Sequence, residues 1–244
     1  MEASGADQEE ACLMAVVQRE RSVERPPSLG DLPGLDSAQP GASSWEPPAS
    51  LATQDADTNV PSMSDPRIVP HHGVTPTLAS DVFIADTARV IGDVHMGPGS
   101  SLWYGAVLRG DVFHIRLGAR VNIQDMAMVH VTHDRFPTLI EDDVTVGHKA
   151  MLHGCTVKRG ALIGMGAMVM DEAVIGEEAL VAAGAVVTPG TLVEPRWLMV
   201  GSPARPRREL RPEELLRLRR SAEHYAALAQ GYRDEGHGAL GGSS

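Results

Sequence analysis

Three histidines with the chemistry of metal ligands lie between Arg109 and Cys155. They are His130, His148 and His153. Three imidazoles with one open position are a familiar catalytic zinc arrangement. The same stretch holds further polar residues that could serve such a site: Arg109, Asp111, Asn122, Gln124 and Asp125. The residue types therefore predict a metal site, provided that the backbone brings the histidines together.

The composition predicts a narrow aliphatic interior. Aromatic residues make up only 4% of the 244 residues, while glycine occurs 25 times. The net charge of −11 argues against a nucleic acid or an anionic membrane surface as partner. The two cysteines, Cys12 and Cys155, lie in unrelated contexts, so a disulfide is not expected and a cytoplasmic location fits. No apolar run is long enough to cross a membrane.

Aliphatic residues recur every six positions over most of the chain, with interruptions at 109–116 and 133–138 and a one-residue slip before Val157. The positions are Ile84, Val90, Met96, Leu102, Leu108, Leu117, Ile123, Val129, Ile140, Val146, Leu152, Val157, Ile163, Val169, Ile175, Val181, Val187 and Val193. A period of six is the hexapeptide repeat of a parallel β-helix, in which three repeats form one coil. The next residue is often small, as at Gly164, which we expect to let the chain turn.

The chain divides into four segments. Residues 1–62 carry 11 acids against three arginines and are rich in proline, so we expect a disordered acidic extension, with Met63 a possible natural start. We expect the β-helix over 63–206, an amphipathic helix over 207–233 and a disordered tail over 234–244. One apolar stripe marks that helix: Leu215, Leu218, Ala222, Tyr225, Ala229 and Tyr232. We expect the stripe to pack along a β-helix, either its own or a neighbour's.

The repeat places the histidines relative to one another. His130 follows the inward Val129, and His153 follows the inward Leu152, so the two share a phase. They are 23 residues apart, which is one 18-residue coil plus five extra residues, and the break at 133–138 is about the right size for a loop of five extra residues. We therefore expect them to stack on adjacent coils, about 4.8 Å apart. His148 has another phase and lies at another corner, which favours a site between the subunits of a cyclic trimer.

Several segments resemble the γ-class carbonic anhydrase family over roughly residues 70–231: RGDV, NIQD, HVTHD, VGHKAMLHGC and GSPAR. The resemblance implies a mainly β fold, a left-handed parallel β-helix with a C-terminal α-helix, assembled as a homotrimer. It implies a metal ion bound by His130 and His153 of one chain and His148 of the next. We expect zinc, while Fe²⁺ or Co²⁺ would also suit imidazole ligands. The resemblance places Gln124 and Asn122 in the catalytic pocket and makes Arg109–Asp111 an interface salt bridge.

The activity that the resemblance implies is reversible hydration of CO2 to bicarbonate by a metal-bound hydroxide. The most active members of the family carry glutamates where this chain has Val112 and His133. His133 could shuttle protons because imidazole titrates near neutral pH, but low activity is also expected. Asp125 is expected to be structural, and Cys155 a small buried residue.

Two other functions remain open. Hexapeptide β-helices often carry acyltransferase chemistry, and a CoA-thioester hydrolase could use the same metal site. A metal-binding scaffold subunit with weak activity would also keep the fold. The fold alone does not choose among the three functions.

Overall fold

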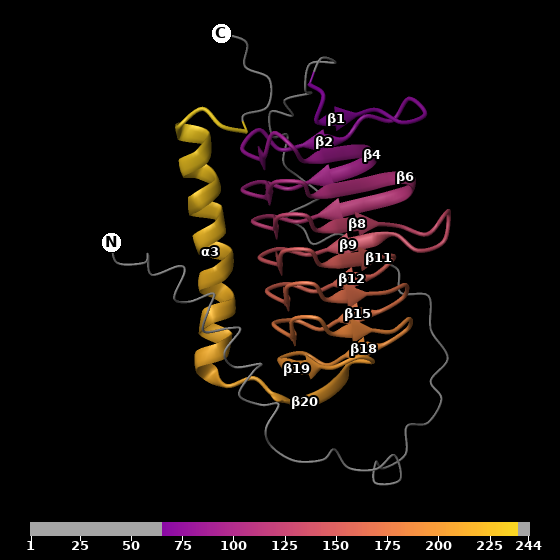
Figure 1. The fold of residues 1–244 in the computed structure, drawn as a ribbon, viewed down its shortest axis with the longest axis vertical. Coiled ribbons are helices and arrows are strands. Elements are labelled where there is room, and N and C mark those ends of the chain that lie inside the picture. Colours follow the sequence, from indigo (N-terminus) through magenta and orange to yellow (C-terminus); the bar gives the residue numbers. More distant parts are fainter. Residues whose placement is uncertain (1–64, 239–244) are drawn as a thin grey trace. The chain divides into compact units, whose positions relative to one another are not determined.

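The computed structural model describes residues 65–238. This part is mainly β, a parallel β-helix of about 7 turns with one C-terminal helix (Figure 1). The expected fold class is therefore confirmed. The expectations for residues 1–62, for a start at Met63 and for residues 239–244 lie outside the described residues.

Three columns of short parallel strands form the faces of the coil. The first face consists of β8 (Met128–His130), β11 (Met151–His153), β14 (Met168–Val169) and β17 (Val186–Val187). The second face consists of β9 (Thr138–Ile140), β12 (Thr156–Val157), β15 (Val174–Ile175) and β18 (Leu192–Val193). The third face consists of β3 (Phe83–Ile84), β5 (Ser101–Leu102), β7 (Asn122–Ile123), β10 (Thr145–Val146), β13 (Leu162–Ile163), β16 (Leu180–Val181) and β19 (Trp197–Val200).

Two longer strands, β4 (Arg89–Met96) and β6 (Val107–Leu117), pair with each other near the start of the coil. The short strands β1 (Ile68–Val69) and β2 (Thr77–Leu78) both pair with β4. β6 joins the first two faces because it pairs with both β8 and β9. The interruption of the repeat at 109–116 lies within this strand, where the β4–β6 register shifts.

The repeated aliphatic residues point into the coil, as the period predicts. All eighteen are at most 5% exposed, and most are completely buried. The slip before Val157 is also present. Leu152 pairs with Val169 at a separation of 17 residues, whereas Ile163 pairs with Val181 at the regular 18.

Where a small residue follows the aliphatic one, its role differs from the expected one. Gly164 does not adopt a positive φ, so it does not act by permitting a left-handed turn. A Cβ at Gly164 would lie 2.5 Å from the backbone nitrogen of Ala183 on the next coil. Glycine is needed there because adjacent coils approach closely. Positive φ values occur elsewhere in the turns, as at Lys149.

Gly164→Ala should therefore destabilise the coil by about 1–3 kcal/mol, the usual range for overpacking. The matched control is Gly231→Ala in the C-terminal helix, where a Cβ would meet nothing within 4 Å. It should stabilise the protein by up to about 1 kcal/mol, because alanine is the better helix former. Urea unfolding at a fixed subunit concentration measures both. Equal effects of the two substitutions would contradict the close-approach explanation.

The helix α3 (Pro212–Asp234) runs alongside the third face of its own chain (Figure 1). Leu218, Ala222 and Ala229 are its buried apolar residues, as the stripe predicts. On the third face, the Trp103 ring contacts Tyr225 and Tyr232 at centroid distances of 5.7 and 5.4 Å. The sequence left open whether the helix packs on its own β-helix or on a neighbour's. In the structure it packs on its own.

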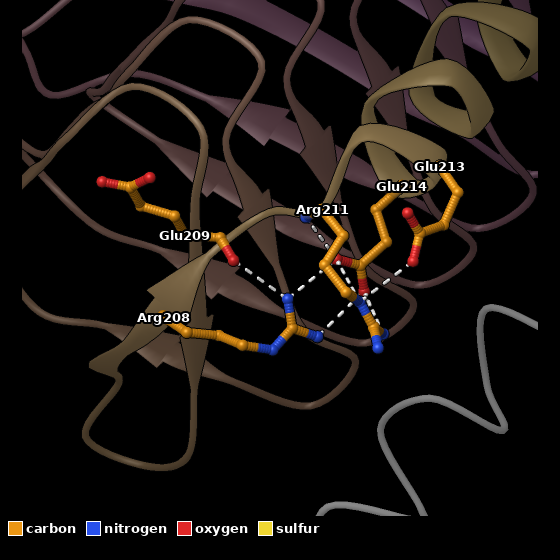
Figure 2. Close-up of polar contacts among 5 residues, drawn as sticks. All are labelled: Arg208, Glu209, Arg211, Glu213 and Glu214. Carbon is orange, nitrogen blue, oxygen red and sulfur yellow. Dashed lines mark hydrogen bonds and ion pairs between the residues drawn. The ribbon is translucent and has the colours of Figure 1, made fainter.

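Both ends of α3 differ from the expected boundaries. The range 207–233 includes part of β20 (Arg205–Glu209), an antiparallel strand that pairs with β19. The helix begins only at Pro212, where Glu214 accepts a hydrogen bond from the backbone N–H of Arg211 and binds two arginine side chains (Figure 2). The structure also describes residues 235–238, which we expected in the tail. The Gly238 carbonyl accepts a hydrogen bond from the Ile84 N–H.

Candidate metal site

His130 and His153 lie side by side on the first face. They are paired residues of the adjacent strands β8 and β11, as the phase of the repeat predicts. The intervening extra residues form a loop closed by a bridge between Thr132 and Phe136. Nδ1 of His130 is 3.1 Å from Nε2 of His153. The stacking prediction is confirmed.

A carboxylate holds the other nitrogen of each ring. Asp111 Oδ1 lies 3.0 Å from His130 Nε2, and Asp171 Oδ1 lies 2.6 Å from His153 Nδ1. A neutral imidazole has a single N–H, which each carboxylate can accept. His130 Nδ1 and His153 Nε2 then face each other with lone pairs. A metal ion placed between these two nitrogens would accept both lone pairs.

The two histidines fit a zinc ion. With Zn–N bonds near 2.0–2.1 Å, two tetrahedral ligand nitrogens are about 3.3 Å apart, close to the observed 3.1 Å. Burial lowers the pKa of His130, which favours the neutral ring that a metal requires. Carboxylate partners of this kind commonly orient metal-bound histidines.

Asp111 connects Arg109 to this pair. Its Oδ2 accepts a 2.6 Å hydrogen bond from Arg109 Nη1, while its Oδ1 contacts His130. Burial alone would raise the pKa of Asp111, but the hydrogen bonds with Arg109 and His130 outweigh it and keep the pKa below its ordinary value. The Arg109–Asp111 ion pair forms within one chain, where it supports His130.

His148 lies apart, in the turn that leads from β10 on the third face to β11 on the first. Its Nδ1 is 2.8 Å from Asp125 Oδ2. Asp125, which we expected to be structural, is thus the partner of a proposed ligand. Within residues 65–238 of a single chain, no three His, Cys, Asp or Glu side chains form a group that could hold a metal. One chain brings together two of the three predicted ligands.

Gln124 and Asn122 accompany His148. Gln124 Oε1 accepts a 3.1 Å hydrogen bond from the His148 backbone N–H, and its Nε2 donates to Asn122 Oδ1 at 3.3 Å. Asn122 Nδ2 donates to Thr145 Oγ1 at 2.9 Å. Asn122 is 1% exposed and Gln124 is 4% exposed. In the single chain, both amides therefore support the turn that carries His148.

Three other predicted residues lie outside this network. The side chain of His133 is 74% exposed and pairs with Asp134. The half-buried Val112 packs against the core, and its carbonyl accepts a hydrogen bond from the Asp134 N–H, so the loop folds back on β6. Cys155 is buried as expected, and burial raises the pKa of its thiol to about 12.

The sequence did not predict two residues of the hydrogen-bond network around His153. Asp171 contacts His153, and Thr132 Oγ1 donates a 2.9 Å hydrogen bond to Asp171 Oδ2. Asp171 belongs to none of the motifs that carry the family resemblance. The one available signal is that Asp171 lies one coil beyond His153, although its separation of 18 residues is one more than the 17 between paired positions here.

The comparisons with known proteins agree with these features. The family model described as bacterial transferase hexapeptide (six repeats) matches residues 154–189. The solved structure of a hexapeptide transferase family protein from Anaplasma phagocytophilum is similar, with a TM-score of 0.65 and 47% identity, over 68% of this chain and 97% of that one.

Several curated relatives are named as carbonic anhydrases, and two of them illustrate the similarity. Gamma carbonic anhydrase 2, mitochondrial, from Arabidopsis thaliana is 46% identical over 166 residues, covering 66% of this chain but only 60% of the plant protein's length. The carbonic anhydrase of Geobacillus kaustophilus is 43% identical over 166 residues, covering 68% of this chain and 91% of the bacterial protein. With this similarity added to the repeat and the paired histidines, the chain belongs to the γ-class carbonic anhydrase family.

Proposed function

We propose that this protein is a carbonic anhydrase that interconverts CO2 and bicarbonate at sites between the subunits of a homotrimer. His130 and His153 of one subunit and His148 of the next would bind a zinc ion, or Fe²⁺ or Co²⁺. The supporting observation is the pair of ring nitrogens 3.1 Å apart whose other nitrogens are held by Asp111 and Asp171. It provides two ligand atoms and leaves the rest of the coordination sphere to a neighbouring chain.

The chain's own residues would prepare the site for this reaction. A bound zinc ion supplies the Lewis acidity that lets a water molecule lose its proton near neutral pH. Asp111 and Asp171 hold the two imidazoles in fixed orientations. Their negative charges raise the basicity of the ring nitrogens that face the ion. Arg109 keeps Asp111 ionised and in place.

Gln124 and Asn122 have distinct proposed roles. Gln124 adjoins the backbone of His148, so in the assembled trimer its amide would hydrogen-bond the reacting oxygen or bicarbonate beside the metal. Asn122 is buried behind it and would position that amide by accepting its N–H. The exposed His133 would exchange protons with bulk water.

Metal analysis and a CO2 hydration assay on the same sample test the proposal. Protein purified without oxygen should contain about one metal ion per subunit and should accelerate CO2 hydration in stopped flow. Removing the ion with a chelator should abolish the acceleration, and adding zinc should restore it. Stoichiometric metal without hydration, or no metal at all, would overturn the proposal.

One specific observation favours a second function, a metal-binding scaffold with weak activity. Val112 offers no carboxylate, and the exposed His133 pairs with Asp134 rather than with any residue of the metal network. The scaffold predicts stoichiometric metal with little hydration, which the same assays detect.

For location we propose the cytoplasm, in keeping with the chain's two cysteines. Within residues 65–238, no helix is long and apolar enough to span a membrane.

A further inference from the structure

Asp171 makes a short contact with a proposed metal ligand. It follows β14 on the first face, one coil beyond His153. Its Oδ1 lies 2.6 Å from His153 Nδ1, and hydrogen bonds to an ionised carboxylate are short. The His130–Asp111 contact, at 3.0 Å, is longer.

The surroundings hold this carboxylate in place. Thr132 Oγ1 donates a 2.9 Å hydrogen bond to Asp171 Oδ2, so both carboxylate oxygens have partners. Thr132 begins the loop that follows β8, and its backbone N–H donates to the Phe136 carbonyl. The loop that separates the two stacked histidines therefore also supports Asp171.

Gly154 makes room for the contact. A Cβ at this position would lie 2.4 Å from Asp171 Oδ1 and 2.9 Å from the Cβ of Phe136. Gly154 has φ of +56°, in the region that other residues rarely adopt. Any side chain here would displace the carboxylate from His153.

We propose that Asp171, supported by Thr132 and accommodated by Gly154, is a positioning residue that keeps the proton of His153 on Nδ1. Nε2 then presents its lone pair toward His130 and the ion. The inference rests on the proposed function only for the identity of the bound ion. The tautomer itself is a property of the metal-free chain.

Asp171→Asn tests the proposal by two independent measurements. In metal-free protein at alkaline pH, nitrogen NMR should show His153 as the Nδ1–H tautomer in the wild type, with an Nε2–H population appearing in the variant. Competition with a chelator should show zinc affinity lowered about 10–100-fold, the usual effect of losing such a partner. Thr132→Val should cause a smaller loss of affinity, because the carboxylate remains.

Asp143→Asn is the matched control. Asp143 pairs with Arg120 on the coil surface and contacts no histidine. It should change neither the tautomer nor the zinc affinity. An unchanged tautomer and unchanged zinc affinity in Asp171→Asn, with the trimer intact, would overturn the proposal. If wild-type protein binds no zinc, the proposed function fails, while the NMR result still decides the role of Asp171.

Discussion

Trimers assembled from a mixture of His148→Ala and His153→Ala subunits should bind zinc, although neither variant should bind it alone. In a trimer that contains both variants, one of the three interfaces combines His130 and His153 of the His148→Ala subunit with His148 of the His153→Ala subunit. Random assembly from equal amounts should therefore restore about a quarter of the wild-type zinc per subunit. Metal analysis of co-expressed, differently tagged subunits measures this fraction.

A second mixture provides the control. His130 and His153 face each other within one chain, so combining His130→Ala with His153→Ala subunits leaves every site without one ligand. That mixture should remain free of zinc. Each variant alone and both mixtures should be trimeric by light scattering. Absence of zinc from the first mixture would place the three ligands in one subunit or exclude a shared site.

Replacing Glu214 by glutamine should destabilise the protein by about 3 kcal/mol at neutral pH. Burial alone would raise the pKa of Glu214, but hydrogen bonds from Arg208 and Arg211 outweigh it and lower the pKa to about 2 from an ordinary value of 4.5. A shift of that size corresponds to about 3 kcal/mol. Figure 2 shows both arginines converging on this carboxylate. Their side-chain nitrogens lie 2.8 to 3.3 Å from its oxygens.

The contribution of Glu214 should depend on pH in one direction. Because its folded pKa is depressed, the stabilisation is complete above about pH 4.5 and disappears as the pH falls toward 2. Wild-type and Glu214→Gln stabilities, measured by urea unfolding, should therefore converge in acid. Glu213→Gln is the control, because Glu213 is exposed and contacts Arg211 at 3.3 Å, and exposed pairs contribute little. A pH-independent difference would contradict this explanation.

The fold could be predicted because its signal is repeated. Each hexapeptide carries its own inward aliphatic, and a misplaced strand would expose that residue. The phase of the repeat also predicted that His130 and His153 would stack, since both directly follow an inward residue. The apolar stripe predicted the helix, although propensity did not show that residues 207–209 belong to a strand. That strand, β20, forms because it pairs with β19. The conformational preferences of residues 207–209 themselves do not reveal this pairing.

The glycines after the aliphatic residues show what the sequence could not predict about the coil. The sequence predicted small residues at these positions, but the reason lies in the distance between coils. Gly164 has no unusual φ, and only the position of Ala183 on the next coil excludes a side chain. Contacts between coils are invisible in the repeat itself.

The sequence by itself determined the β-helix, the stacked pair of histidines and the separate position of His148, because all three follow from counting residues along a regular coil. The tertiary structure decided which side chains support the ligands. Asp171 reaches His153 only because Gly154 leaves space and Thr132 holds the second oxygen. Such contacts depend on side-chain directions between coils, which the period of six does not specify.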